Sequence, residues 1–243
     1  MHVDVVLTAE RLAPDSVEGA SVLVIDVLRA STTIVSALTH GCRALIPVAD
    51  ADEARRRARA YSGQAPLLAG ERRGETIGGF DLGNSPLEVA GPHIRGRTVL
   101  LTTSNGTRAL LAARRAAAIG VAGFVNLSAA AAWATRLGLP IALACAGERG
   151  AVSLEDQVCA GLLATRLAES DPGRPLTPAA REAARVAEPY GKDLGRLRQD
   201  SPWARHLIRT GRSGDVDACL SLDTATLVPV YRPDVDEIVA GRG

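Results

Sequence analysis

The sequence predicts an α/β protein with a layered α/β/α arrangement, a mostly parallel or mixed sheet, and a smaller C-terminal α/β subdomain or lid. Short apolar runs alternate with alanine-rich segments of helical period, which is the pattern of β-α-β units. Hydrophobic residues make up 47% and charged residues 23% of the 243 positions, close to the globular average. These proportions exclude the disordered and fibrous classes.

The expected strands and helices follow one another in the order that this fold requires. Strands are expected over residues 21–27, 44–47, 67–69, 98–103, 119–125 and 141–146. Helices are expected over 32–38, 108–117 and 153–167, and a further alanine-rich helix is expected to be capped by Ser128. Asp50, with Glu53 three residues later, predicts a capping box at the start of another helix.

Residues 171–243 differ in character from the main catalytic region, which we expect over residues 1–170. Helices are expected over 177–187 and 202–210, each with a proline in its first turn, and a terminal strand pair over 216–231. We expect this tail to be a smaller subdomain packed on the main region. Residues 70–92 are a long loop rich in Gly, Asn and Pro, and such loops are often functional.

Composition also limits the expected partners and location. A formal net charge of +1 and an aromatic content of 3% favour neither nucleic acid nor an anionic membrane as a partner. No signal peptide or membrane-length apolar run is recognisable, and the four cysteines lack CxxC or metal-finger spacing. We therefore expect a cytoplasmic protein with reduced thiols, and a homo-oligomer is left open.

Polar side chains gather where the first buried strand is expected to end. Asp26 closes an apolar run, and an unpaired carboxylate there would be costly. Either Arg29 forms an ion pair with Asp26 or a divalent cation binds it. Ser31, Thr32 and Thr33 open the next helix, where they either cap free N–H groups or join the helix dipole in binding an anion. We favour a functional role for this segment.

A second polar turn, TTSNGTR, follows another expected strand at residues 102–108. Asn105 and Gly106 suit a tight turn with no function. The two preceding threonines, Thr102 and Thr103, and the following Arg108 go beyond what a turn needs, and hydroxyls, free backbone N–H groups and Arg108 together would hold a phosphate, carboxylate or sulfonate.

A third turn, CAGERGAVSLED, covers residues 145–156 and contains Glu155 and Asp156. A capping box between Ser153 and Asp156 is sufficient to explain their spacing. Glu148 and Arg149, between two glycines, favour a site.

The long loop adds Glu71, Arg72 and Asp81 to the polar residues of the three turns. Ligands of open α/β sheets bind beyond the carboxyl ends of the strands. Carboxylates at positions 26, 71 and 81 are the hard ligands that Mg²⁺ prefers, and arginines at 29, 72 and 108 offer forked contacts to anions. The pattern indicates a metal-assisted reaction on a small, multiply anionic substrate.

Several common hydrolase signatures are absent from the sequence. It contains no P-loop, no cysteine-phosphatase spacing, no GxSxG and no HExxH motif. The segment Asp26-Val27-Leu28 lacks the second aspartate of haloacid-dehalogenase phosphatases.

Six segments carry a resemblance to a known family: VIDVLRASTT at 24–33, LAGER at 68–72, GFDLGNSP at 79–86, TTSNGT at 102–107, CAG at 145–147 and SLEDQVCAG at 153–161. Together they resemble the magnesium-dependent 2-phosphosulfolactate phosphatases, known from coenzyme M biosynthesis. The resemblance implies hydrolysis of 2-phospho-3-sulfolactate to 3-sulfolactate and phosphate, with Mg²⁺. The chain departs from the family pattern at Trp203 and Ala204, where a His-Gly pair is usual.

The motifs and turns together nominate three sets of site residues. Catalytic roles are expected for Asp26, Arg29, Glu155 and Asp156, and the expected magnesium ligands are Asp26, Glu71 and Asp81. Substrate binding is expected for Ser31, Thr32, Thr33, Arg72, Asn84, Ser85, Thr103, Asn105, Gly106, Thr107 and Arg108. Two alternatives stay open: a phosphatase of another phosphorylated hydroxy acid or sugar acid, and a non-catalytic protein that binds a small anion.

Overall fold

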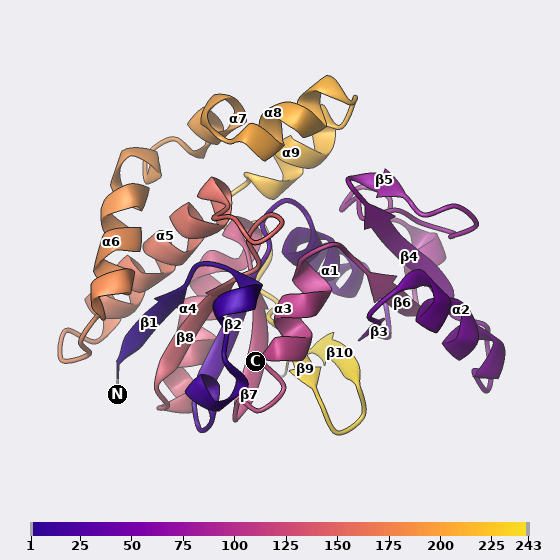
Figure 1. The fold of residues 1–243 in the computed structure, drawn as a ribbon, viewed down its shortest axis with the longest axis horizontal. Coiled ribbons are helices and arrows are strands. Elements are labelled where there is room, and N and C mark those ends of the chain that lie inside the picture. Colours follow the sequence, from indigo (N-terminus) through magenta and orange to yellow (C-terminus); the bar gives the residue numbers. More distant parts are fainter. Residues whose placement is uncertain (1, 242–243) are drawn as a thin grey trace.

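The computed structural model describes residues 2–241, and these form one mixed sheet with helices on both faces (Figure 1). The strands are β1 (Val3–Val6), β2 (Ser21–Ile25), β3 (Ala44–Pro47), β4 (Leu67–Arg72), β5 (Glu75–Thr76), β6 (Thr98–Thr102), β7 (Ala118–Ala122), β8 (Ile141–Cys145), β9 (Pro229–Arg232) and β10 (Glu237–Ala240). Their order across the sheet is β1-β8-β2-β7-β9-β10-β3-β6-β4-β5. The predicted layered α/β fold with a mixed sheet is confirmed.

The sheet consists of two parallel halves joined by an antiparallel hairpin. Strands β1, β8, β2 and β7 are parallel to one another, and so are β3, β6 and β4. Between the halves, β9 pairs antiparallel with β7, β10 pairs antiparallel with β9, and β3 pairs antiparallel with β10. The C-terminal hairpin therefore closes the gap between two β-α-β halves.

Nine α-helices lie within the described residues. They are α1 (Ala30–Thr39), α2 (Ala51–Ala60), α3 (Gly106–Ala112), α4 (Leu127–Leu137), α5 (Leu154–Ser170), α6 (Pro178–Ala187), α7 (Leu197–Asp200), α8 (Pro202–Arg209) and α9 (Ser213–Cys219). Helix α1 leads from β2 to β3, and α3 leads from β6 back to β7, so each helix crosses from one half of the sheet to the other. Their first residues meet, because a Cβ on Gly106 would lie 2.7 Å from the Cβ of Ala30.

Two apolar layers cover the faces of the first half of the sheet. Leu23 and Ile25 of β2 pack with residues of α4, α5 and α6, whereas Val22 and Val24 pack with residues of α1 and α3. This alternation is the strand period of two, with both faces buried. The crossing helices α1 and α3 therefore share one face, and their N-termini lie together beside the end of β2.

The tail beyond residue 170 packs on the same cores as the rest of the chain. Gly161 of α5 approaches the backbone of Ala183 in α6 so closely that any side chain there would clash. Figure 1 shows α7, α8 and α9 above the carboxyl end of β2, while β9 and β10 lie within the sheet. The division at residue 171 stays a prediction, and it falls where α5 ends.

Three local predictions need comment. The strand pair expected over 216–231 is wrong: its first part lies in α9, and the hairpin strands are β9 and β10. Ser128 is not the N-cap, because α4 already begins at Leu127. The backbone N–H of Ser128 donates instead to Asp223 Oδ1 at 2.7 Å. The helix start predicted at Asp50 is confirmed, because the Glu53 N–H donates to Asp50 Oδ1, but the return bond of a capping box is shifted by one residue: Glu53 Oε2 accepts the Ala49 N–H instead of the Asp50 N–H.

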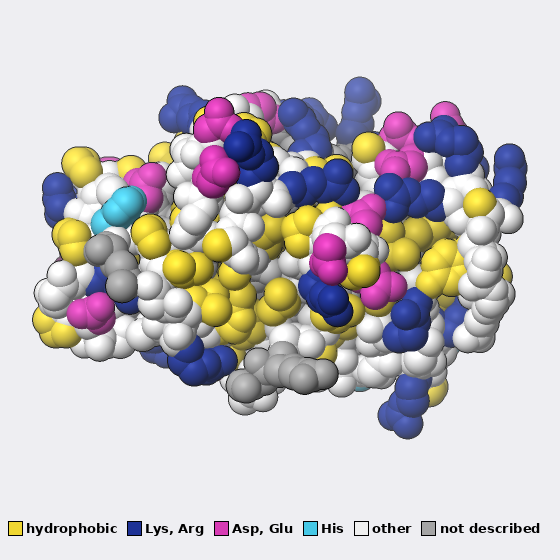
Figure 2. All heavy atoms as spheres, turned by 90° about the horizontal axis from the view of Figure 1, so that it is seen from below, with side chains coloured by type: hydrophobic (Ala, Val, Ile, Leu, Met, Phe, Trp, Pro, Cys, Tyr) yellow, Lys and Arg dark blue, Asp and Glu magenta, His cyan; other side chains and the backbone are white. Residues whose placement is uncertain are grey.

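Charge is spread over the surface in small groups. Figure 2 shows the molecule from below the view of Figure 1, with apolar side chains over the middle of that face and arginines standing out mainly around its periphery. Among the helices of the described chain, none combines the length and apolar character that crossing a bilayer would take.

Candidate active site

The turn after β2 folds back on the start of α1. The backbone N–H of Asp26 donates to Ser31 Oγ at 2.9 Å, and the Ser31 N–H donates to the Asp26 carbonyl at 2.8 Å. The Ala30 N–H donates to Asp26 Oδ1 at 3.2 Å. The Asp26 carboxylate thus lies at the N-terminus of α1, where the helix dipole stabilises negative charge. The anion site expected at this helix start is already taken by a side chain of the protein.

The hydroxyls of Ser31 and Thr32 at the same helix start bond the backbone of the turn. Thr32 Oγ1 donates to the Val27 carbonyl at 3.2 Å, and Ser31 Oγ donates to the Val24 carbonyl at 3.4 Å. Thr33 Oγ1 is buried and has no hydrogen-bond partner within the described chain. These three residues therefore shape the turn, and the structure brings none of them to the cavity walls described below.

Arg29 is buried, and its partner is Asp215 rather than Asp26. Arg29 Nη1 lies 2.6 Å from Asp215 Oδ2, and Arg29 Nη2 donates to the Gly74 carbonyl at 2.9 Å. Ser85 Oγ donates to the other Asp215 oxygen at 2.5 Å. The alternative in which Arg29 neutralises Asp26 is wrong. Asp215 lies in α9, so this ion pair holds the C-terminal helices against the turn.

The acids at the start of α5 face the same turn. Asp156 accepts the Val27 N–H at 2.8 Å on one carboxylate oxygen and the Gly147 N–H at 3.1 Å on the other. The expected capping contact is also present, because the Asp156 N–H donates to Ser153 Oγ at 3.3 Å. Asp156 therefore ties the loops after β2 and β8 together in addition to its place in the helix cap.

Glu71 links two chain segments in the second half of the sheet, as Asp156 does in the first. Its two carboxylate oxygens accept the backbone N–H groups of Ser104 and Gly74, each at 2.7 Å. Asn105, in the loop after β6, donates from Nδ2 to Glu148 Oε2 at 3.2 Å. The carboxyl ends of β2, β8, β4 and β6 thus converge on one place, although the two halves of the sheet run in opposite directions.

These residues enclose two small cavities. One has a volume of about 20 Å³ and is lined by Asp26, Leu28, Arg29, Glu71, Arg73, Asn84, Ser104, Asn105, Glu148, Arg149 and Trp203. The other, of about 10 Å³, is lined by Asp26, Leu28, Asn105, Gly147, Glu148, Ser153, Glu155, Asp156 and Trp203. A volume of this size holds about one water molecule. We call the two together the acid cavity.

Like charges crowd the acid cavity. Burial, with the neighbouring charges of Glu71, Glu148 and Glu155, raises the pKa of Asp26 to about 7. Burial, with the charges of Asp26 and Glu155, raises the pKa of Asp156 well above its usual range. Such a cluster stays in place only by binding protons or a cation.

The two remaining acids of the cavity titrate in the same direction. Burial raises the pKa of Glu155 despite hydrogen bonds from Ser201 and Ser153. Burial also raises the pKa of Glu148, against the opposing charge of Arg149. Acids with raised pKa values in a cleft are candidates for catalytic proton transfer.

Three predicted residues lie elsewhere. Arg72 is next to Glu71 in β4 and points to the opposite face, where its guanidinium donates to Thr102 Oγ1 at 3.0 Å. Asp81 is exposed, and its carboxylate accepts the Leu68 N–H at 2.8 Å, near the other end of β4. Arg108 is exposed and pairs with Glu10 at 3.1 Å. The structure does not bring these three side chains to Asp26.

The second turn combines structural and site residues. Thr103 and Thr107 bond each other, since the Thr107 N–H donates to Thr103 Oγ1 and Thr107 Oγ1 donates to the Thr103 carbonyl. Asn105 lines the acid cavity. Gly106 is needed for close approach, because a Cβ there would lie 2.6 Å from Asp26 Oδ2.

Asn84 and Ser85, from the long loop, both reach this region. Ser85 holds Asp215, as described above. Asn84 is only 4% exposed, its Oδ1 has no partner within the described chain, and its side chain lines the acid cavity.

The sequence reading missed several residues that the fold brings to the cavity. Arg73 has a positive φ of 57° and lines it, and Trp203 reaches it from α8, with its indole N–H donating to the Leu28 carbonyl at 3.0 Å. Asp215 and Trp203 carry no local sequence signal for a site. Glu148 was not missed, because its place with Arg149 between two glycines after a buried strand already favoured a site in the sequence.

The donor set fits a cation bound by few carboxylates. No group of three or more acidic, His or Cys side chains within residues 2–241 is arranged to hold a metal ion. Mg²⁺, however, is usually bound by one or two carboxylates together with waters and substrate phosphates. Asp26 Oδ2 has no hydrogen bond within the described chain, and Glu148 lines the same cavity. Asp26 and Glu148 therefore fit the binding of Mg²⁺ by one or two carboxylates. Residues 2–241 do not offer the larger set of side chains that would enclose the ion with protein ligands alone.

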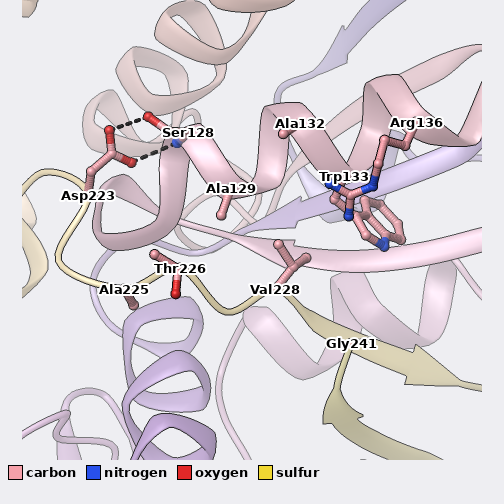
Figure 3. A pocket seen from close by; sticks show the side chains of 10 residues that line it. All are labelled: Ser128, Ala129, Ala132, Trp133, Arg136, Asp223, Ala225, Thr226, Val228 and Gly241. Atoms are coloured by element: carbon pink, nitrogen blue, oxygen red, sulfur yellow. Dashed lines mark hydrogen bonds between the residues drawn. The ribbon is translucent and has the colours of Figure 1, made fainter. Parts of the chain in front are cut away.

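A cavity of about 390 Å³ lies away from this site (Figure 3). Its floor is formed by small and apolar side chains of α4 and the chain before β9, with Arg136 at one end and the Ser128–Asp223 hydrogen bonds at the other. It shares no lining residue with the acid cavity.

The fold is that of an α/β protein with a candidate active site where strand ends converge on the acid cavity. Residues 6–234 match the 2-phosphosulpholactate phosphatase family. The chain belongs to this family.

Relatives with the same description align over nearly their full length. A probable 2-phosphosulfolactate phosphatase of Symbiobacterium thermophilum is 37% identical over 223 residues, covering 92% of this chain and 94% of the relative. One from Thermotoga petrophila is 40% identical, covering 90% and 92%. One from Clostridium botulinum is 33% identical over 242 residues, covering 98% and 99%.

Proposed function

We propose that the chain hydrolyses 2-phospho-3-sulfolactate to 3-sulfolactate and phosphate in an Mg²⁺-dependent reaction. The observation that carries this proposal is the acid cavity, where Asp26, Glu71, Glu148, Glu155 and Asp156 converge in a buried place next to Arg29 and Asn84. Membership in the 2-phosphosulpholactate phosphatase family supports the choice of substrate.

The charge of the cavity supports the requirement for a divalent cation. A phosphate ester is itself anionic, so a group of carboxylates repels it unless positive charge intervenes. We assign Asp26 and Glu148 as the carboxylates that hold Mg²⁺. Bound Mg²⁺ would neutralise charge on the phosphoryl oxygens and leave the substrate positioned for attack by water.

The chain's own residues supply orientation and proton transfer. We assign Glu155, which is buried at the cavity wall, as the acid that protonates the leaving oxygen, because burial raises its pKa and so favours the protonated form. Asp156 accepts the backbone N–H groups of Val27 and Gly147 and thereby holds the loops around the cavity in place. Trp203 lies over the same place and excludes water from it.

Phosphate release from a panel of esters tests the proposal. We expect Mg²⁺-dependent release from 2-phospho-3-sulfolactate, at least about tenfold faster in kcat/KM than from 2-phospholactate, because the sulfonate adds charge-assisted contacts. Equal rates would favour another phosphorylated hydroxy acid as substrate. Thermal stabilisation by sulfolactate without phosphate release under any Mg²⁺ concentration would favour an anion-binding protein instead.

We further propose that the enzyme acts in the cytoplasm and supplies sulfolactate to coenzyme M biosynthesis. The four cysteines are all buried and free, which suits a reducing compartment. The proposed substrate is small and anionic, so neither nucleic acid nor membrane is required, and a homo-oligomer stays open.

A further inference from the structure

A second cavity adjoins the acid cavity. It has a volume of about 230 Å³, and its walls come from the β4–β5 hairpin, the long loop and the start of α9. Arg29 and Asn84 line both cavities, so the two spaces meet at these side chains. The two parts of the acid cavity, about 20 Å³ and 10 Å³, are too small for the whole substrate, so only its reacting end can face them, whereas the second cavity has room for the organic part.

Most polar groups of the second cavity are already satisfied. Both Asp215 oxygens are bonded, one by Arg29 and one by Ser85, so this pair contributes no free charge. Glu88 accepts the Gly83 N–H at 2.6 Å.

Two side chains keep unused capacity. Asn84 is 4% exposed, its Oδ1 is buried without a donor, and its Nδ2 donates to no group of the described chain, so both ends of the amide are available to a ligand. Arg212 lines the second cavity with a side chain 23% exposed, and it pairs at 2.7 Å with Glu75, which is 65% exposed. An ion pair with so exposed a partner contributes little free energy, so a ligand anion can replace Glu75.

We propose that the second cavity is the subsite for the anionic organic part of the substrate, with Arg212 binding its acid group and Asn84 Nδ2 donating to the substrate where the two cavities meet. This inference rests on the proposed function and deepens it: the phosphoryl group lies at the acid cavity, and the sulfonate or carboxylate end lies against Arg212. The site therefore selects phosphate esters of small organic acids over esters of neutral alcohols.

Steady-state kinetics of Arg212→Gln on two esters tests the subsite. The esters are 2-phospho-3-sulfolactate and glycerol 2-phosphate, which lacks a second acid group. We expect the KM for phosphosulfolactate to rise about tenfold with kcat within about twofold, and the KM for glycerol phosphate to stay unchanged. Glu75→Gln should lower the KM for phosphosulfolactate, because it frees Arg212.

Arg209→Gln is the matched control, because Arg209 is exposed on α8 and has no ion pair within the described chain. Both constants should stay at the wild-type level in this variant. Equal effects of Arg212→Gln on the two esters, or no effect on either, would overturn the subsite. If the wild-type protein hydrolyses neither ester, the proposed function fails on its own, and calorimetry with 3-sulfolactate then decides. The subsite requires about tenfold weaker binding by Arg212→Gln, and equal or undetectable binding to both proteins overturns it.

Discussion

The carboxylate of Asp156 accepts the backbone N–H of Val27 at 2.8 Å, although the two residues are 129 positions apart. This bond fixes the start of α5 against the turn after β2. It brings Asp156 close enough to Asp26 for each carboxylate to affect the other. One buried acid therefore both builds the turn and contributes to the charge that the turn must accommodate.

Asp156→Asn should reduce both stability and turnover. An amide cannot accept both the Val27 and Gly147 N–H groups as a carboxylate does, so one buried donor loses its partner. We expect a loss of about 1–3 kcal/mol in the free energy of unfolding, measured by urea denaturation, and at least about a hundredfold loss in kcat. Unchanged values of both would show that the two bonds do not hold the turn.

Gly106→Ala should displace Asp26. The new Cβ would lie 2.6 Å from Asp26 Oδ2 and 2.7 Å from the Ala30 Cβ, and neither can move without disturbing the turn. We expect at least about a tenfold fall in kcat/KM. Gly78→Ala is the control, because a Cβ there meets nothing within 4 Å and activity should stay unchanged. Equal activity of the two variants would contradict the close packing.

Stability without a divalent cation should fall as the pH rises. The pKa of Asp26 is raised to about 7 in the folded state from 3.8, so the folded protein binds a proton that the unfolded chain releases. The stability that this proton contributes, up to roughly 4 kcal/mol, is complete below about pH 4, is lost progressively between about pH 4 and pH 7, and is absent above pH 7.

Urea denaturation in EDTA at pH 5 and pH 8 measures this effect for the wild type and Asp26→Asn. The variant has no carboxyl group to ionise, so its stability should fall less between the two pH values. Parallel curves for the two proteins would show that Asp26 titrates at an ordinary pKa.

The buried Arg29–Asp215 pair should hold the C-terminal helices in place. Asp215→Asn leaves the guanidinium without a balancing charge and should cost about 3–5 kcal/mol in the free energy of unfolding. The double variant Arg29→Met with Asp215→Leu should be less destabilised than Asp215→Asn. Arg115→Met, at an exposed pair with Asp15, should cost less than about 1 kcal/mol in the same urea measurement. A similar cost for the buried and exposed pairs would contradict the role of Asp215.

The central strands β2, β3, β6 and β8 could be predicted because each is a short, mainly apolar run that is buried on both faces, whereas the partly exposed β1 and the exposed β5 lack this pattern and were not expected. The order of the strands across the sheet could not be predicted from the sequence. The opposite directions of the two halves depend on β9 and β10, which form far along the chain and fill the middle of the sheet. No local sequence pattern indicates that a C-terminal hairpin pairs with β7 and β3.

The candidate site shows the same division between local and long-range information. Asp26 could be predicted as a site residue because an unpaired carboxylate at the end of a buried apolar strand is energetically costly and so indicates a partner or a function. Arg72 was nominated along with Glu71, although neighbouring residues of a strand point to opposite faces. Asp215 and Trp203 reach the site from helices that pack over it, so only the folded chain reveals them.

Phosphate release from 2-phospho-3-sulfolactate by wild type and Asp26→Asn, each titrated with Mg²⁺, tests the central claim most directly. Asp26 lines both parts of the acid cavity, so the wild type should respond to Mg²⁺, and the variant should lose at least about a thousandfold in kcat while remaining folded. Wild-type turnover in Asp26→Asn at any Mg²⁺ concentration would contradict the assignment of the acid cavity as the active site.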